Sequence, residues 1–287
     1  MFFEKGASVQ IWKKIALALL VMALATACSN NVVHGNGVSR IGCVTIDSDA
    51  PQSEMVRQTK HFETLRNLSL DGLVAEVEVK TDGDSGVIVE SETTREATDR
   101  LKYASESKND GTLRVGLSCV EGEVRLQSMP KLTITISSRA DVRLKEFSGD
   151  MSLGSIDGTF SSENCGVGEV EASDVDSVSI RDGGTVDYSF DSVVNGLSAD
   201  LSGAGSLSAS SVTGTMKINS SGTGDATVDD GKLSFLELET SGTGDLAFDG
   251  QASQASLSTS GTGDITVASV GNLIRQESSG TGEISLG

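Results

Sequence analysis

Hydrophobic positions in the second half of the chain recur in steps of two on the far side of glycine-rich motifs. Counting from the first glycine of each motif, the fourth position reads Val170, Tyr188, Leu207, Ala226, Leu246, Ile265 and Ile284. The sixth position reads Ala172, Phe190, Ala209, Val228, Phe248, Val267 and Leu286. Successive side chains of a strand point to opposite faces, so steps of two predict strands rather than helices.

A second pair of columns precedes the same glycines. Six positions before, the chain has Phe160, Val178, Leu197, Met216, Leu236, Ala255 and Ile274; four positions before, it has Ser162, Ile180, Ala199, Ile218, Leu238, Leu257 and Gln276. A third set, Val175, Val193, Val212 and Val270, supplies another inward side. The glycines are therefore predicted to mark corners between inward-facing strands.

The corner motif itself repeats at a nearly fixed spacing. Gly222-Thr223-Gly224-Asp225 returns at Gly242, Gly261 and, with Glu283 in place of Asp, at Gly280, after a related Gly203-Ala204-Gly205. A period near 19 residues indicates one structural unit stacked on copies of itself. We predict an all-β fold, a single-stranded right-handed parallel β-helix whose coils lie about 4.8 Å apart. The glycines would serve corners that need positive φ or close backbone approach.

The first half of the chain shows the same kind of strand in a less regular order. Strands are predicted at 62–70, 73–80, 86–91, 112–120 and 131–137, separated by turn dipeptides such as Asp71-Gly72. We place the β-helix domain at 61–287. Residues 28–60 are polar without a sustained period and are interpreted as a tether, with one strand at Ile41 to Ile46.

The N-terminus resembles a lipoprotein signal peptide, which we place at 1–27. Lys13 and Lys14 precede an apolar run from Ile15 to Ala27, which is too short to span a bilayer but suits a signal-peptide core. Small residues just before Cys28 resemble the bacterial lipobox, so Cys28 is the predicted lipidation site. Ser29 after it resembles outer-membrane sorting. An ordinary secreted protein is the alternative.

The cysteines limit the possible disulfides, and the net charge limits the possible binding partners. With Cys28 acylated, Cys43, Cys119 and Cys165 remain; we expect a small buried thiol at Cys165 and take Cys43–Cys119 as the candidate disulfide. The formal charge is −19. Such a chain repels nucleic acid, because phosphate binding needs clustered Lys and Arg. Cationic partners and divalent ions remain possible.

The residues resemble a known family. The strand-rich opening from Phe62, the turn Asp110-Gly111-Thr112-Leu113 and the recurring Ser-Gly-Thr-Gly-Asp look like the head GIN domain family of "putative auto-transporter adhesin" proteins over residues 62–287. The resemblance implies a right-handed β-helix exported to the bacterial envelope, with adhesion implied by the family's name alone and no activity attached to it. No membrane-barrel segment follows the stack, so Cys28 would supply the anchor.

The acids after the corner glycines are the candidate metal site. Asp225, Asp245, Asp264 and Glu283 occupy one position in successive coils, and stacked carboxylates could bind calcium through oxygen ligands. The alternative is that each Asp accepts local backbone N–H groups at its corner. The column of Thr223, Thr243, Thr262 and Thr281 is interpreted as stacking between coils.

Three functions remain open at this level. The first is a lipid-anchored, non-catalytic binding or adhesion module of the cell envelope, held in the outer membrane, with a surface polysaccharide or protein as ligand and no cofactor. The second is a structural protein that forms homo-oligomers through its uncapped last coil, Ile284-Ser285-Leu286-Gly287. The third, a polysaccharide-active enzyme, lacks the outward aromatic platforms and the clear acid pair that such enzymes use.

Overall fold

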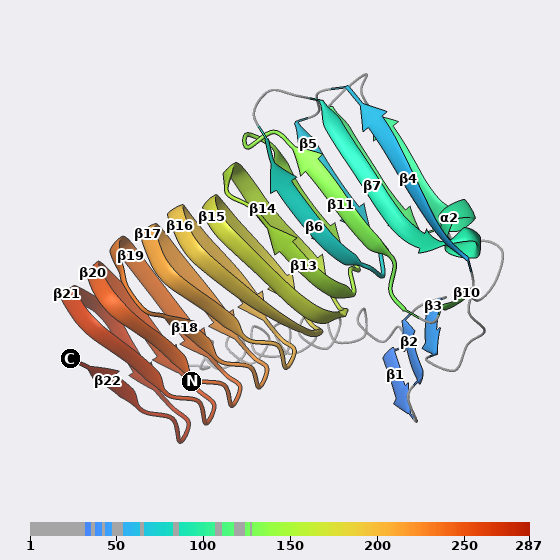
Figure 1. Cartoon of the computed structure of the whole chain (residues 1–287). Coiled ribbons are helices and arrows are strands. Elements are labelled where there is room, and N and C mark those ends of the chain that lie inside the picture. The colour runs from blue at the N-terminus through green and yellow to red at the C-terminus, as the bar shows by residue number, and fades with distance from the viewer. Residues whose placement is uncertain are drawn as a thin grey trace, which may run out of the picture.

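The computed structural model describes residues 32–35, 38–41, 44–47, 54–63, 66–82, 86–106, 111–117, 124–126 and 128–287. They form an all-β, mostly parallel solenoid of about 8 turns with about 19 residues per turn (Figure 1). The predicted parallel β-helix is therefore confirmed. Strands far apart in sequence lie side by side because each turn stacks on the one before it.

The regular part of the solenoid runs from residue 141 to the end. Its strands are β12 (Asp141–Lys145), β13 (Gly149–Leu153), β14 (Ile156–Asn164), β15 (Val167–Asp182), β16 (Thr185–Leu201), β17 (Leu207–Ser220), β18 (Ala226–Val228), β19 (Gly231–Thr240), β20 (Leu246–Thr259), β21 (Ile265–Ser278) and β22 (Ile284–Leu286). Strands of successive coils pair in parallel; Tyr188 of β16, for example, lies opposite Leu207 of β17. The long strands end at the glycine corners: β17 ends at Ser220, for example, and β18 begins at Ala226 after Gly222-Thr223-Gly224.

The predicted hydrophobic columns form the core. Val170, Tyr188, Leu207, Ala226, Leu246 and Ile265 pair successively across the strands and are all buried. Aromatic rings pack together within this core: Phe160 lies edge-on to Phe190, with ring centroids 5.6 Å apart. Each inward side chain thus packs against its equivalents in the coils above and below.

The last coil departs from the expected pattern. Ala255 pairs with Leu273, and Ser256 with Arg275, so Ile274 is an extra residue in β21. Ile274 is 56% exposed and Gln276 is also exposed, although both were assigned to inward columns. The assignment of Ile274 is wrong because counting back from Gly280 assumes that no residue is inserted between the corner and the column. Gln276 keeps its place opposite the buried Leu257, but β22 pairs only with residues 265–267 of β21, so no strand of the described chain covers it.

The first half of the described chain extends the stack with mixed pairing. β5 (Asn67–Asp71), β6 (Glu76–Thr81) and β11 (Lys131–Ile136) make parallel pairs, whereas β7 (Val87–Thr94) runs antiparallel to β11 and to β4 (Met55–Phe62). β8 (Leu101–Glu106) and β9 (Thr112–Leu117) form an antiparallel pair whose β9 joins β5. The strands predicted here are present, with shifted ends.

Two features of this half were not predicted. A short helix, α2 (Arg95–Arg100), follows β7. A separate four-stranded sheet contains β1 (Val32–Gly35), β2 (Val38–Ile41), β3 (Val44–Asp47) and β10 (Val124–Leu126). The range interpreted as a tether therefore holds three short strands, and β4 begins within it at Met55.

The corner glycines serve close backbone approach rather than positive φ. None of the glycines in the Gly-Thr-Gly motifs has positive φ. A Cβ built on Gly242 would lie 2.0 Å from the carbonyl oxygen of Gly222, and one on Gly244 would lie 2.0 Å from that of Gly224. Only glycine lets successive corners stack at this separation.

Candidate functional site

The solenoid has two long outward sides of different charge. The acidic side consists of the outward residues that follow each glycine corner, and its carboxylates are Asp150, Glu169, Glu171, Asp187, Asp225, Asp245, Asp264 and Glu283. The mixed side consists of the outward residues of the strands that precede each corner, and it carries Arg143, Arg181, Lys217 and Arg275 among acids. From β13 to β22 the acidic side thus carries carboxylates without basic residues, whereas the mixed side carries both charges.

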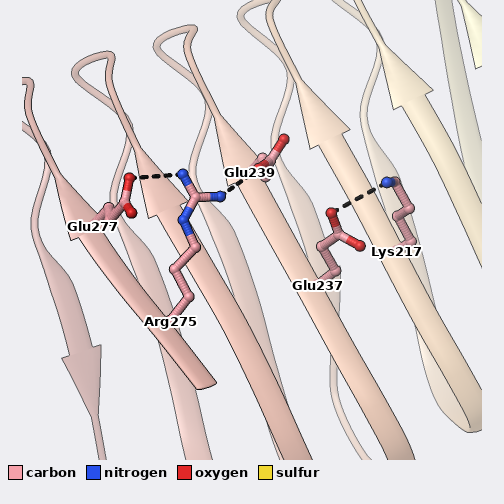
Figure 2. Close-up of polar contacts among 5 residues, drawn as sticks. All are labelled: Lys217, Glu237, Glu239, Arg275 and Glu277. Carbon is pink, nitrogen blue, oxygen red and sulfur yellow. Dashed lines mark hydrogen bonds and ion pairs between the residues drawn. The ribbon is translucent and has the colours of Figure 1, made fainter. Parts of the chain in front are cut away.

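Ion pairs on the mixed side form between adjacent coils, across an intervening coil and within one strand. Lys217 Nζ lies 3.1 Å from Glu237 Oε1. Arg275 lies between two acids, 3.2 Å from Glu239 and 2.7 Å from Glu277 (Figure 2). The hydrogen bond and charge of Arg275 lower the pKa of Glu277 below its usual range. These exposed pairs balance charge between coils and add little to stability individually.

The predicted metal residues form a ladder of hydrogen bonds on the acidic side. The backbone N–H of Asp245 donates to Asp225 Oδ1 at 2.8 Å, and that of Asp264 donates to Asp245 Oδ1 at 2.8 Å. Glu283 N–H donates to Asp264 Oδ1 at 2.7 Å. Each Asp therefore accepts from the next coil rather than from its own corner, which corrects the local interpretation and gives the column a structural role.

The ladder also extends further than the repeated motif. Ser206 donates its backbone N–H to Asp187 Oδ1 at 2.8 Å, and its hydroxyl donates to the same oxygen at 2.7 Å. Glu169 pairs in register with Asp187 and with Asp150. Within the described part of the chain, no group of three or more His, Cys, Asp or Glu side chains is arranged to hold a metal ion. Calcium binding by the column stays a prediction.

A buried polar cluster lies inside the solenoid at the corner between β15 and β16. Tyr188 Oη lies 2.9 Å from Ser162 Oγ and donates to Asp182 Oδ1 at 3.4 Å. Gly184 N–H donates to Asp182 Oδ2 at 3.1 Å. Burial raises the pKa of Asp182 to about 7, against the lowering effect of these hydrogen bonds. Sequence reasoning missed this cluster because Asp182 stands where other coils have Leu201 or Ser220.

Among the grooves on the surface of the described residues, one lies on the acidic side and one on the mixed side. The first, of about 390 Å³, lies between β6, β11, β13 and β15, where Lys131 pairs with Glu76 at 2.8 Å. The second, of about 450 Å³, is crossed by β15, β16, β17 and β19. Its lining includes Phe235, Asn195, Thr215 and Lys217. The second groove combines an aromatic ring with amide, hydroxyl and charged groups.

One observation tests the prediction made for Cys165. Cys165, at the corner between β14 and β15, is half-buried and disulfide-bonded, so the expectation of a buried free thiol is wrong. The predicted lipidation site Cys28 and the predicted pair Cys43 and Cys119 lie outside the described residues. Each cysteine sulfur can form either a disulfide or an acyl linkage, but not both. If the Cys165 bond is made within the chain, acylation of Cys28 and a Cys43–Cys119 bridge therefore cannot both hold.

Membrane contact was predicted through Cys28 alone. Over the ranges that the structure describes, no helix is long and apolar enough to cross a bilayer.

Comparison with known proteins identifies the fold. No protein-family model matches the chain, and no curated protein does either. A solved "putative adhesin" from Parabacteroides distasonis is similar over 84% of this chain and 99% of its own, with a TM-score of 0.57 and 11% identity. A "putative adhesin" from Bacteroides fragilis covers 82% of this chain and 98% of its own, with a TM-score of 0.55 and 13% identity.

A "putative lipid binding protein" from Parabacteroides distasonis is also similar. It covers 81% of this chain and 96% of its own, with a TM-score of 0.55 and 12% identity. At such low identity these likenesses show a shared fold. Membership of the head GIN domain family stays a prediction, and the chain is a parallel β-solenoid of the kind found in these three proteins.

Proposed function

We propose that this protein is a non-catalytic binding or adhesion module of the bacterial cell envelope, with a surface polysaccharide or protein as its ligand. The observation that carries the proposal is the pair of long outward sides, on which side chains of successive coils are aligned in register. Such a surface offers a repeating, pre-ordered array to an extended ligand, which reduces the entropy lost on binding. The likeness to solved proteins described as adhesins supports the same class.

Binding is tested with the whole protein, purified in mild detergent and labelled with a fluorophore. The labelled protein should bind to bacterial or host cells in a saturable manner and be displaced by unlabelled protein. A protein with its solenoid unfolded by heat serves as the control. Absence of saturable binding to every cell surface tried, with the solenoid folded by circular dichroism, would refute the proposal.

The proposed location is the outer membrane, with Cys28 carrying the lipid. Buried acyl methylenes contribute roughly 0.8 kcal/mol each, so several chains on one residue would give a stable anchor. Cells grown with an alkyne fatty acid should label the wild-type protein and leave Cys28→Ser unlabelled. Cys28→Ser should also leave the membrane fraction. Labelling that persists in Cys28→Ser would exclude Cys28 as the anchor.

Self-association is the second candidate, favoured by apolar side chains on the last coil. Ile274 is 56% exposed and Leu286 is 42% exposed, and Leu273 beside them is partly buried. A second copy of the chain would cover these apolar side chains. Sedimentation over a concentration series should show dimers that Ile274→Lys abolishes. A monomer at all concentrations would eliminate this candidate.

A further inference from the structure

Phe235 is placed unlike the other aromatic residues of the stack. Between residues 128 and 287 the buried aromatic residues are Phe147, Phe160, Tyr188, Phe190 and Phe248. Phe235 is the one aromatic residue of that fully described range that is not buried, and it stands on the mixed side, in β19. A large apolar ring on the surface of a stack whose other rings are buried requires an explanation.

Phe235 faces outward in register with outward residues of the preceding coils, and an inserted residue lies just before it. Gly214 of β17 pairs with Leu233 of β19, but the next residue, Thr215, pairs with Phe235. Ser234 is therefore an extra residue, and its hydroxyl donates to the carbonyl oxygen of Gly214 at 2.9 Å. Because of this bulge, two consecutive residues, Ser234 and Phe235, stand between the buried Leu233 and Leu236.

Small residues precede Phe235 in its column. Thr215 pairs with Gly196, and Gly196 pairs with Ser177, in the three preceding coils. A Cβ built on Gly196 would lie 3.1 Å from Thr215 Oγ1, so the threonine hydroxyl lies directly over the glycine. The ring of Phe235 therefore stands at the end of a row of small residues, and the result is the groove of about 450 Å³. Its volume is in the usual range for small-ligand sites, roughly 300–1,000 Å³.

Polar side chains line the same groove as Phe235. The Lys217–Glu237 ion pair, with its atoms 3.1 Å apart, lines the groove one column away from Phe235 (Figure 2). Asn195, which also lines it, donates its amide N–H to Asp176 of the preceding coil, which holds the amide in place. The hydroxyls of Ser198 and Thr215 add groups that can both donate and accept.

A saccharide matches this combination. One face of a sugar ring presents C–H groups that pack on an aromatic ring, whereas its hydroxyls need donors and acceptors around the edge. A wholly apolar ligand would leave the ion pair and the hydroxyls desolvated without partners, which is costly. We infer that the groove beside Phe235 is a saccharide-binding site. The inference rests on the proposed function, because it names the ligand class and the place of the binding module.

The test uses the whole protein on an array of neutral and acidic oligosaccharides, followed by titration calorimetry with those that bind. Phe235→Ala should weaken binding at least about tenfold, whereas Phe235→Trp, which keeps a ring, should stay within about threefold of wild type. Ser198→Trp should block the groove. Its matched control is Ser189→Trp in the same strand, β16, on the acidic side, and it should bind as wild type does.

The outcomes separate this inference from the broader proposal. Oligosaccharide binding that Phe235→Ala and Ser198→Trp abolish, but Ser189→Trp does not, supports the site. Saturable cell binding without any oligosaccharide binding overturns the saccharide site and leaves the adhesion module standing. Oligosaccharide binding that Phe235→Ala and Ser198→Trp leave unchanged places the ligand elsewhere and overturns the site as well. Equal melting temperatures of the variants establish that each has folded.

Discussion

Asp182 pairs in register with Asn164 of the preceding coil, and each side chain is only 2% exposed. The two share a role at their corners: Asn164 Oδ1 accepts the backbone N–H of Cys165 at 3.0 Å, and Asp182 Oδ2 accepts that of Gly184 at 3.1 Å. The asparagine side chain accepts this hydrogen bond without carrying a charge. Aspartate must either bury its charge or keep a proton.

Asp182 therefore makes stability depend on pH. Burial raises its pKa to about 7 in the folded protein, from 3.8 without the fold. The folded state holds the proton over a range where the unfolded chain has lost it, so stability should fall as pH rises from about 4 to about 7 and then level off. Asp182→Asn should remove this dependence and stabilise the protein at pH 8 by about 1–3 kcal/mol.

Urea unfolding of wild type and Asp182→Asn at pH 5 and pH 8 measures the effect. Asp249→Asn, which removes an exposed carboxylate from β20, is the control and should follow the wild-type profile. An equal difference between wild type and Asp182→Asn at both pH values would show that Asp182 does not titrate in this range.

Gly242→Ala should destabilise the stack, because the new Cβ would lie 2.0 Å from the carbonyl oxygen of Gly222. The two corners would have to separate, which breaks the hydrogen bond from Thr243 N–H to the same oxygen. We expect a loss of roughly 2–4 kcal/mol by urea unfolding. Ser241→Ala, an exposed change at the adjacent position, should alter stability by less than about 0.5 kcal/mol. Similar values for both would show that the corner can relax.

The fold could be predicted from the sequence because every coil requires the same residue types at the same positions. Val170 and its equivalents must face inward, and Gly242 and Gly244 must lie against the carbonyl oxygens of the preceding coil. Each demand appears in several coils, so one irregular coil does not hide the pattern. The parallel stack and its core could therefore be predicted residue by residue.

The candidate sites were harder to predict because they depend on exceptions to the repeat. Phe235 stands at an outward position that Ser177, Gly196 and Thr215 fill with smaller residues in the preceding coils. Ile274 is itself an inserted residue of β21. The charge of Asp182 depends on burial at a corner where Leu201 stands in the next coil. Irregular positions carry the functional information in a repeat, and a period does not describe them.

The aspartate ladder should tolerate loss of charge but not loss of the acceptor. Asp245 Oδ1 accepts the backbone N–H of Asp264 at 2.8 Å. Asp245→Ala removes the acceptor and should cost about 1 kcal/mol in urea unfolding. Asp245→Asn keeps an oxygen there and reduces repulsion along the column, so its stability should match or exceed that of wild type. Equal losses in both variants would show that the charge itself is required.

The calcium prediction is tested on the same variants. If Asp225, Asp245 and Asp264 share an ion, calcium added after chelation should raise the melting temperature of wild type and not that of Asp245→Asn. Magnesium at the same concentration controls for screening of the acidic side. An unchanged wild-type melting temperature would leave the column with its hydrogen-bonding role alone.

The bond of Cys165 decides between two predictions about the other cysteines. A non-reducing proteolytic digest should yield a cross-linked pair that contains the Cys165 peptide, because Cys165 is disulfide-bonded. A partner at Cys43 or Cys119 leaves Cys28 available for acylation and rules out the Cys43–Cys119 bridge. A partner at Cys28 would instead occupy the thiol that a lipid anchor needs. Alkylation of Cys165 in the unfolded protein without reductant would contradict the bond.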